Sequence, residues 1–264
     1  MQQNWSTFSA TFNTRQPFVL AVIVETHGST YHKAGAMMLI DQHGKGTGLL
    51  SGGCLEEDIG LHAQAIMQTN IIKRISYNLQ SDDDAIWGLG LGCDGALDIA
   101  LIPLGESAIG AMFEKMLSDV DEGRKGRLLL SVAEEGESEV TFHSLATAPA
   151  SVAYNRNDER LEVPIIPPKH IVVCGAGPDA DPMVAMMTLL GWQVSIVDHR
   201  KVALNRAAFS ACQHKVSYKA LDDVCALLSK ADGVVIMTHS LERDGRLLVM
   251  SLDSNVPYVG LLGP

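Results

Sequence analysis

The sequence predicts an α/β protein in which an N-terminal α+β domain is followed by a doubly wound parallel sheet. Two observations predict this: strand-like and helix-like segments mix with a hairpin in the first part, whereas short strands and helices alternate in the last part. A stretch rich in proline and polar residues separates the two parts. We therefore expect domains over residues 1–145 and 169–264, joined by a linker over 146–168.

The first domain is expected to hold one sheet of five or six strands and two helices. Residues 18–26 are rich in β-branched side chains and predict a buried strand. Apolar residues recur at helical spacing over 54–68, and acidic residues lie in the first turn, where the helix dipole favours them. The other expected elements are hairpin strands 37–41 and 47–50, strands 71–79 and 96–103, helix 108–120, and a solvated hairpin of 127–133 and 139–142.

The second domain shows the alternation that is typical of a parallel sheet. A short apolar strand, 170–174, precedes a glycine-containing turn and a helix over 181–190, which Asp181 can cap. The next strand, 193–197, ends beside Asp198. The remaining expected elements are helix 221–228, strand 233–237, helix 246–251 and strand 258–262.

Composition excludes several classes of protein. The chain has 264 residues and a net charge of -11, which disfavours nucleic acid or an anionic membrane as the main partner. No apolar run approaches the roughly 20 residues that a membrane span requires, and the first residues lack the pattern of a secretory signal. Five cysteines without a C-x-x-C pair predict a reduced, cytoplasmic protein without a structural zinc site.

Two glycine-rich turns in the first domain each hold a cysteine, Cys54 after Gly52-Gly53 and Cys93 between Gly92 and Asp94-Gly95. Glycine permits positive φ angles and close approach of a ligand to the backbone amides. A thiol in such a turn can meet a soft metal. The alternative is a pair of tight turns with buried cysteines. We expect the two turns to form one pocket lined by amides and sulfur.

The second domain opens with a dinucleotide-type turn. Gly175 and Gly177 are followed by the small Ala180, and Asp198 lies about 20 residues after the turn, where it could accept hydrogen bonds from a ribose. This pattern predicts a Rossmann-like fold. The alternative is a turn retained for packing, without a nucleotide. Pro178 and the acidic residues at positions 179 and 181 disfavour ordinary NAD binding, because they remove an amide donor and add negative charge.

Jointly, the motifs of both halves resemble the XdhC/CoxI family, accessory proteins of xanthine-dehydrogenase-type molybdenum enzymes. The resemblance covers most of the chain. It rests on Glu25-Thr26-His27-Gly28-Ser29-Thr30, Lys33-Ala34-Gly35-Ala36-Met37-Met38, Ser51-Gly52-Gly53-Cys54-Leu55-Glu56, Gly88-Leu89-Gly90-Leu91-Gly92-Cys93-Asp94-Gly95, Cys174-Gly175-Ala176-Gly177-Pro178, Val197-Asp198-His199-Arg200, Met237-Thr238-His239 with Asp244, and Tyr258-Val259-Gly260-Leu261-Leu262-Gly263.

This resemblance implies an N-terminal cofactor-handling domain and a C-terminal Rossmann domain. It implies binding of the molybdenum cofactor (molybdopterin), support for its sulfuration, and delivery to an apo molybdoenzyme of the xanthine dehydrogenase type, with a cysteine desulfurase as a further partner. The molybdenum side would meet Cys54 and Cys93. The residues expected to bind the cofactor or a nucleotide are Gly28, Ser29, Gly52, Gly53, Cys54, Glu56, Gly92, Cys93, Asp94, Gly95, Gly175, Gly177, Asp198 and His239.

The chain departs from the family at two places. Tyr31-His32 stands where members more often have Pro-Arg, so a contact credited to that arginine is in doubt. The chain also stops directly after a predicted strand, where members commonly continue, which predicts a truncated or naturally short C-terminus.

Other functions stay open on the residues alone. One alternative is an NAD(P)-dependent oxidoreductase that uses the Rossmann domain, for which His239 is the one fair catalytic candidate. Another is a structural dimer module with a degenerate Rossmann domain. The resemblance favours a cofactor-binding chaperone over a catalyst, and we expect a homodimer.

Overall fold

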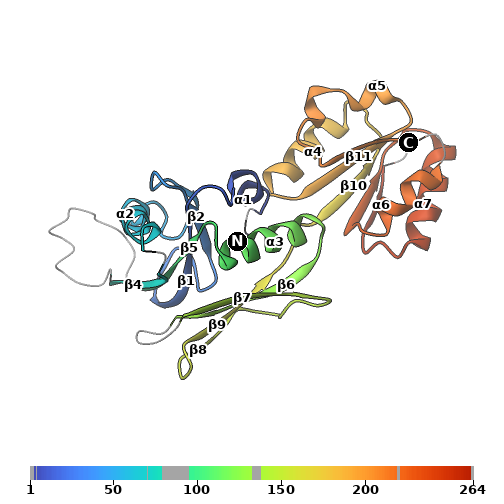
Figure 1. The fold of residues 1–264 in the computed structure, drawn as a ribbon. Coiled ribbons are helices and arrows are strands. Elements are labelled where there is room, and N and C mark those ends of the chain that lie inside the picture. The colour runs from blue at the N-terminus through green and yellow to red at the C-terminus, as the bar shows by residue number, and fades with distance from the viewer. Residues whose placement is uncertain are drawn as a thin grey trace. The chain divides into compact units, whose positions relative to one another are not determined.

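The computed structural model describes residues 3, 5–69, 71–78, 95–132, 138–218 and 221–262. The chain divides into two compact units, Met1–Pro167 and Pro168–Pro264 (Figure 1). Each unit has its own sheets and its own hydrophobic cores.

The first unit is built around an antiparallel sheet in the order β3-β2-β1-β5-β4. The central strand β1 is buried on both faces as predicted, because Val19 and Ile23 point to one core whereas Leu20 and Val22 point to another. The strands are β1 (Phe18–Gly28), β2 (Met37–Ile40), β3 (Gly46–Gly48), β4 (Lys73–Asn78) and β5 (Gly95–Leu104).

Helices cover both faces of this sheet. Helix α2 (Glu56–Met67) packs its buried residues Ile59 and Ala63 against one face. Helix α3 (Ala108–Asp121) packs Phe113 and Met116 against the other face, and α1 (Trp5–Thr11) joins the same core. Among the described residues of this unit there are thus three helices rather than the expected two, because the short segment of α1 is too polar to stand out in the sequence.

A second antiparallel sheet, in the order β7-β6-β9-β8, corrects the prediction of a single sheet. Its strands are β6 (Lys125–Ser131), β7 (Glu139–Leu145), β8 (Ala153–Asn155) and β9 (Arg160–Ile165). The last two lie within the expected linker, 146–168, so most of that segment is folded. The alternating residues Leu161, Val163 and Ile165 are buried in the core shared with α3, and the polar stretch before them is a hairpin turn.

The second unit is the predicted doubly wound parallel sheet, in the strand order β12-β11-β10-β13-β14. All of its neighbouring pairs are parallel, and β10 and β13 are the central pair at which the chain reverses its direction of strand addition. The strands are β10 (His170–Cys174), β11 (Gln193–Asp198), β12 (His214–Ser217), β13 (Gly233–Ile236) and β14 (Val259–Leu261).

Helices cover both faces of the parallel sheet and form two cores. Helix α4 (Ala180–Leu189) and the short α5 (Lys201–Leu204) pack on one face, through Val184 and Leu204. Helix α6 (Cys225–Leu228) and α7 (Leu241–Asp253) pack on the other, through Leu228 and Leu247. Two 3-10 turns complete the unit, Ala207–Phe209 and Leu221–Val224.

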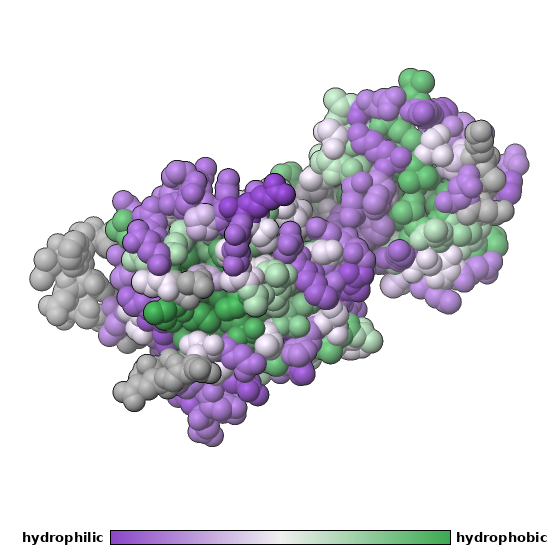
Figure 2. Space-filling view, in the orientation of Figure 1, coloured by the Kyte–Doolittle hydropathy of each residue, from purple (hydrophilic) through white to green (hydrophobic). Residues whose placement is uncertain are grey.

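The surface of this unit is mixed, and Figure 2 shows hydrophobic patches among hydrophilic residues on it. Exposed apolar side chains include Leu189 on α4, Leu241 on α7 and Tyr258 before β14. Within the described part of the chain, no helix combines the length and the apolar character needed to cross a bilayer.

Candidate functional site

Three segments that carry predicted site residues meet at one end of the first sheet. Gly28 ends β1 and is paired with Gly95, the first residue of β5. A Cβ atom at Gly95 would overlap the carbonyl oxygen of Ser29, so the loop after β1 requires glycine there. On its other side the same loop contacts the turn before α2, because a Cβ at Gly52 would lie 3.0 Å from the ring of Tyr31.

Gly28, Ser29 and Gly95 are therefore neighbours, and Gly52 contacts the same loop at Tyr31. Gly53 continues the same turn with a φ of 102° and open space around it. The predicted residues Gly92, Cys93 and Asp94 lie outside the described residues. The expected pocket between the two glycine turns therefore stays a prediction.

The turn before α2 is organised by the carboxylate of Glu56. Its Oε1 accepts hydrogen bonds from the amides of Leu50 (3.0 Å) and Ser51 (2.8 Å). Its Oε2 accepts from the amides of Gly53 (3.0 Å) and Leu55 (3.2 Å), and from the Ser51 hydroxyl. Burial raises the pKa of Glu56, but the hydrogen bonds from Ser51 and the amides outweigh it, so the pKa lies below the ordinary value.

This arrangement changes the predicted role of Glu56 and of the glycine turn. The amides that were expected to face a cofactor face a carboxylate of the protein itself. A carboxylate has about four lone-pair positions, so the five donors leave Glu56 no capacity for a ligand. Glu56 therefore shapes the turn rather than contacting cargo.

Cys54 lies in the middle of this turn. Its amide donates to the Ser51 hydroxyl oxygen (3.1 Å), and its half-buried side chain packs on the edge of the α2 core. Lys33 is exposed in the facing loop, where its Nζ bonds the carbonyl of Gly28 and the hydroxyl of Thr30, each at 3.3 Å. A thiol and an ammonium group are thus carried by adjacent loops.

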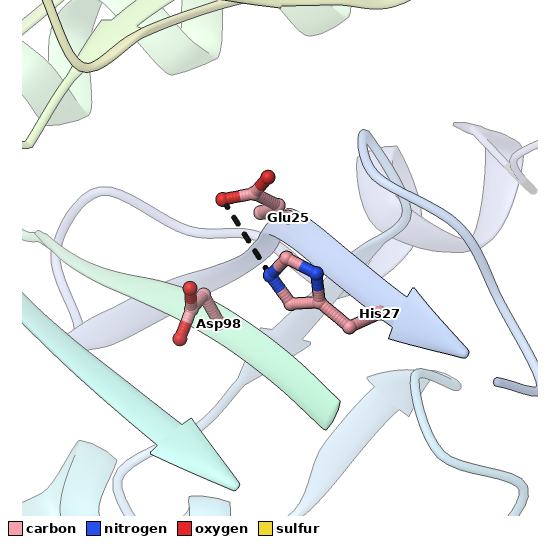
Figure 3. Close-up of side chains that lie close together, drawn as sticks. All are labelled: Glu25, His27 and Asp98. Atoms are coloured by element: carbon pink, nitrogen blue, oxygen red, sulfur yellow. Dashed lines mark ion pairs between the residues drawn. The ribbon is translucent and has the colours of Figure 1, made fainter. Parts of the chain in front are cut away.

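A charged network that the sequence analysis missed lies beside these loops. Glu25 and His27 on β1 and Asp98 on β5 point toward one another, with ligand atoms within 4.8 Å (Figure 3). Their convergence depends on a bulge at Val24, where the register with β5 shifts by one residue. The bulge moves Glu25 and His27 to the face of Asp98, although plain alternation would place them on the α2 face. The sequence signal that was available was the run of polar residues ending β1.

Arginines already compensate both carboxylates of this network. Arg74 donates to Asp98 at 2.8 Å and also bonds Glu159 and Tyr154, while Arg156 donates to Glu25 at 2.6 Å. Burial raises the pKa of Asp98, but the bonds from Ser76 and Arg74 outweigh it and hold the pKa below the ordinary value. Because each carboxylate has a cationic partner, the network suits fastening the β8–β9 hairpin to the end of β1 better than holding a divalent metal.

The Rossmann-type turn in the second unit has the predicted backbone geometry. Gly175 has a φ of 121°, and a Cβ there would overlap the carbonyl oxygen of Met237. Asp198 accepts from the amide of Ala176 (2.8 Å) and from the backbone and guanidinium of Arg200 (2.7 to 3.0 Å). Burial raises the pKa of Asp198, but the bonds from Arg200 and Ala176 lower it to about 2. The carboxylate expected to face a ribose is therefore fully engaged within the protein.

The space through which a phosphate would approach Gly177 is also occupied, in this case by the carboxylate of Asp179. A Cβ at Gly177 would overlap Oδ1 of Asp179, and the other oxygen of Asp179 lies 2.7 Å from Nε2 of His239. His239 has a φ of 58° and stands in the loop after β13, so this ion pair spans the central crevice of the sheet. Asp244 does not support His239, because it accepts from the amide and hydroxyl of Thr238 (3.1 and 2.5 Å).

The remaining cysteines of the described residues offer no second thiol at either turn. Cys174 is buried, which raises its pKa to about 12. Cys212 is buried as well, and Cys225 is exposed on α6. Cys54 is therefore the one described thiol that lies in a predicted site.

Comparison with known proteins assigns this architecture to a family. Residues 12–78 match the XdhC and CoxI family, and residues 171–264 match the XdhC Rossmann domain. The chain belongs to the XdhC and CoxI family. The two matched segments of this XdhC-type chain are the ones that contain the Cys54 turn and the Gly175 turn.

Two relatives align along almost the whole XdhC-type chain. A Bacillus subtilis protein named as a probable xanthine dehydrogenase subunit is 27% identical over 275 residues, covering 96% of this chain and 82% of that protein. A crystal structure described as a xanthine dehydrogenase from Bacillus halodurans has a TM-score of 0.80 and 26% identity, covering 99% of this chain and 82% of that one. Both relatives are thus named for xanthine dehydrogenase.

Proposed function

We propose that this XdhC-family protein binds the molybdenum cofactor in its first unit, supports its sulfuration and delivers it to a xanthine-dehydrogenase-type molybdoenzyme. The observation that carries the proposal is the meeting of the loop after β1, the Cys54 turn and Gly95 at one end of the first sheet. The names of the two relatives support the choice of recipient. The cofactor is cargo in this proposal, not a resident group.

The chemistry of the meeting point suits such cargo. The thiol of Cys54 is a soft donor for the molybdenum side, and the exposed ammonium of Lys33 suits a phosphate or dithiolene anion. The amides of Leu50, Ser51, Gly53 and Leu55 are not part of the contact set, because Glu56 occupies them. In this proposal the sulfur comes from a cysteine desulfurase, and the protein acts as a homodimer.

Retention of molybdopterin tests this function. The full chain is incubated anaerobically with the cofactor, desalted and denatured, and the released pterin is measured by fluorescence. We expect near-stoichiometric pterin in the parent protein and at least a tenfold loss in Cys54→Ala, with the parent level in Cys225→Ala, whose thiol is exposed in the other unit. Parent-level retention by Cys54→Ala would overturn the thiol role, and absence of pterin from the parent would overturn the function.

The second candidate function is an NAD(P)-dependent oxidoreductase. The β10–α4 turn and the parallel sheet favour it, since this architecture binds dinucleotides at the carboxyl ends of its strands. The positions of Asp179 and Asp198 argue against it, because Asp179 fills the space beside Gly177 and Asp198 is already engaged by Ala176 and Arg200. The cofactor-carrier function is therefore the better supported of the two.

A further inference from the structure

The tip of the β8–β9 hairpin, residues 156–159, carries opposite charges at its two ends. Nε of Arg156, directly after β8, donates to Oε1 of Glu25 on β1 at 2.6 Å. Oε1 of Glu159, directly before β9, accepts from Nη1 of Arg74 on β4 at 3.3 Å. Strands β1 and β4 lie on either side of β5, so the hairpin tip is fastened across three neighbouring strands.

The fastening is specific for one placement of the hairpin. Arg74 is 15% exposed and bonds both sides of the hairpin, because it also donates to the Tyr154 hydroxyl of β8 at 3.4 Å. Glu159 has a φ of 48°, and a residue other than glycine keeps this conformation only where its surroundings hold it. A cation and an anion on the hairpin tip thus face an anion and a cation on the sheet, so a reversed placement would bring like charges together.

The same hairpin supports the loop after β1, residues 29–36. A Cβ at Gly35 would lie 2.7 Å from Cγ2 of Val152 and 3.3 Å from Cγ1 of Val163, so both valines lie against the backbone of this loop. Val152 directly precedes β8, and Val163 belongs to β9. The amide of Gly35 donates to the carbonyl of Ile23 on β1 at 2.8 Å. The end of the loop is therefore held between β1 and the hairpin.

The other part of this loop contacts the Cys54 turn. A Cβ at Gly52 would lie 3.0 Å from the ring of Tyr31. Lys33 lies between Tyr31 and Gly35 in the chain, and its ammonium group bonds back to the start of the loop. The loop thus has the hairpin on one side and the Cys54 turn on the other, and the position of Lys33 depends on both.

We propose that the β8–β9 hairpin is a support that positions the loop after β1 beside the Cys54 turn, with Arg74 and Arg156 as its positioning residues. In this proposal neither arginine contacts the cargo. Both act through the hairpin, which presses Val152 and Val163 against Gly35. The proposal rests on the proposed function only in naming molybdopterin as the ligand that the positioned loop would help to bind.

Hydrogen exchange of the full chain, followed by peptide mass spectrometry, tests this proposal. Arg156 is 67% exposed, so Arg156→Gln removes its ion pair without opening the core. We expect the peptide that covers the loop to exchange about fivefold faster, because a partly exposed ion pair contributes modestly to stability. Peptides from α3 and β6 should exchange at the parent rate, since only a global loss of stability would accelerate them as well.

Three further variants separate fastening from packing. Arg127→Gln is the matched control, because it removes an ion pair with Glu162 in the middle of β9, at 3.2 Å, and should change the loop by less than about twofold. Val152→Ala keeps both ion pairs of the hairpin tip and should still accelerate the loop. Arg156→Glu alone should accelerate the loop, whereas its combination with Glu25→Arg should restore the parent rate within about twofold.

An unchanged loop in Arg156→Gln or in Val152→Ala would overturn the proposal. An equal acceleration in Arg127→Gln, or in every peptide of the first unit, would overturn it too. The charge-swapped pair supports positioning by the ion pair if it restores the loop, and contradicts it if the loop stays fast.

Retention of molybdopterin by the same variants separates this proposal from the proposed function. We expect at least a threefold loss in Arg156→Gln and the parent level in Arg127→Gln. Parent-level retention by Arg156→Gln, despite a faster loop, would overturn the role of the loop position in binding. Absence of pterin from the parent would overturn the function, whereas the exchange rates would still decide whether the hairpin holds the loop.

Discussion

The two units share one local feature but differ in the side chains that surround it. Each has a glycine turn leading into a helix, at Gly52-Gly53 before α2 and at Gly175–Gly177 before α4. In both turns, a carboxylate of the protein lies where a phosphate would approach. Glu56 does this in the first unit and Asp179 in the second, where Asp198 also accepts from the amide of Ala176.

The two turns differ in the other side chains that lie beside them. The first turn presents the thiol of Cys54 beside the loop that carries Lys33, whereas the second presents an ion pair between Asp179 and His239. The first turn thus has chemistry left for a ligand, and the second has its polar groups paired with one another. A glycine-rich turn in a sequence therefore indicates backbone shape, and the partners of its amides decide whether a ligand is bound.

The largest expected effect concerns whether backbone contact shapes the loop after β1 in the first unit and the turn before α4 in the second. Gly95→Ala and Gly175→Ala each place a Cβ against a backbone carbonyl, of Ser29 and Met237 respectively. We expect a loss of roughly 3 kcal/mol or more in the free energy of unfolding for each, from overlap at Gly95 and from overlap together with strain at Gly175, whose φ is 121°. The controls Gly53→Ala and Gly191→Ala have positive φ but open space, and should lose about 1 kcal/mol.

Urea unfolding of the full chain, followed by circular dichroism, provides the measurement. An equal loss at Gly175 and at the two open glycines would show that conformational strain alone is responsible at Gly175. A small loss in Gly95→Ala would mean that the loop after β1 is not held against β5.

The parallel unit was predictable from the sequence because its signals are local. The β10 strand, the turn with Gly175 and the helix after it are consecutive, and each has its own residue pattern. Strand β12 escaped prediction because His214–Ser217 is a short edge strand with exposed residues. Helix α7 begins earlier than expected, since its first turn is polar.

The first unit was harder because its key features depend on pairing between distant residues. The hairpin of β8 and β9 was taken for a linker, since Pro164 and a polar turn hid the alternation that ends at Ile165. The meeting of Glu25 with Asp98 depends on the bulge at Val24, and register is invisible in a single sequence. The engagement of Glu56 escaped for the same reason: a first-turn acid predicts a dipole effect, not which amides it will bind.

The effect of intermediate size concerns how the charge of Asp198 contributes to stability at different pH values. Asp198 is 2% exposed and its pKa is lowered to about 2, so its charged form stabilises the fold. Asp198→Asn should lower the free energy of unfolding by about 2 kcal/mol at pH 7. Because the folded-state pKa is depressed, the stabilisation is complete above the ordinary range near pH 4 and is lost as the pH falls toward 2.

The difference in the free energy of unfolding between Asp198→Asn and the parent should therefore become smaller below about pH 4 and vanish near pH 2. Thermal unfolding across this range gives the measurement. Asp253→Asn, an exposed change at the end of α7, is the matched control and should differ from the parent by less than about 0.5 kcal/mol. A gap for Asp198→Asn that does not vary with pH would contradict the assigned role of its charge.

The smallest expected effect concerns nucleotide binding, and it would remove the difference between the two turns. If Asp179 is what closes the second turn, Asp179→Ala should allow the diphosphate of NADPH to approach Gly177. We expect stabilisation of this variant by about 1 kcal/mol at about five times the dissociation constant, and none of the parent at the same concentration. Thermal shift with NADPH and with pyrophosphate gives the measurement, and stabilisation of the parent by NADPH would revive the oxidoreductase alternative.

The tethered carboxylate of Glu56 has a consequence for selectivity in a crowded solution. Orthophosphate and sulfate bind to exposed clusters of backbone donors. A carrier with such a cluster would bind these anions in place of a scarce cargo. Because Glu56 is attached to the chain beside its own donors, its effective concentration is high and undiminished by dilution. In the proposed function, common inorganic anions would find these amides occupied by Glu56, and recognition of the cargo would rest on the Cys54 sulfur and on shape.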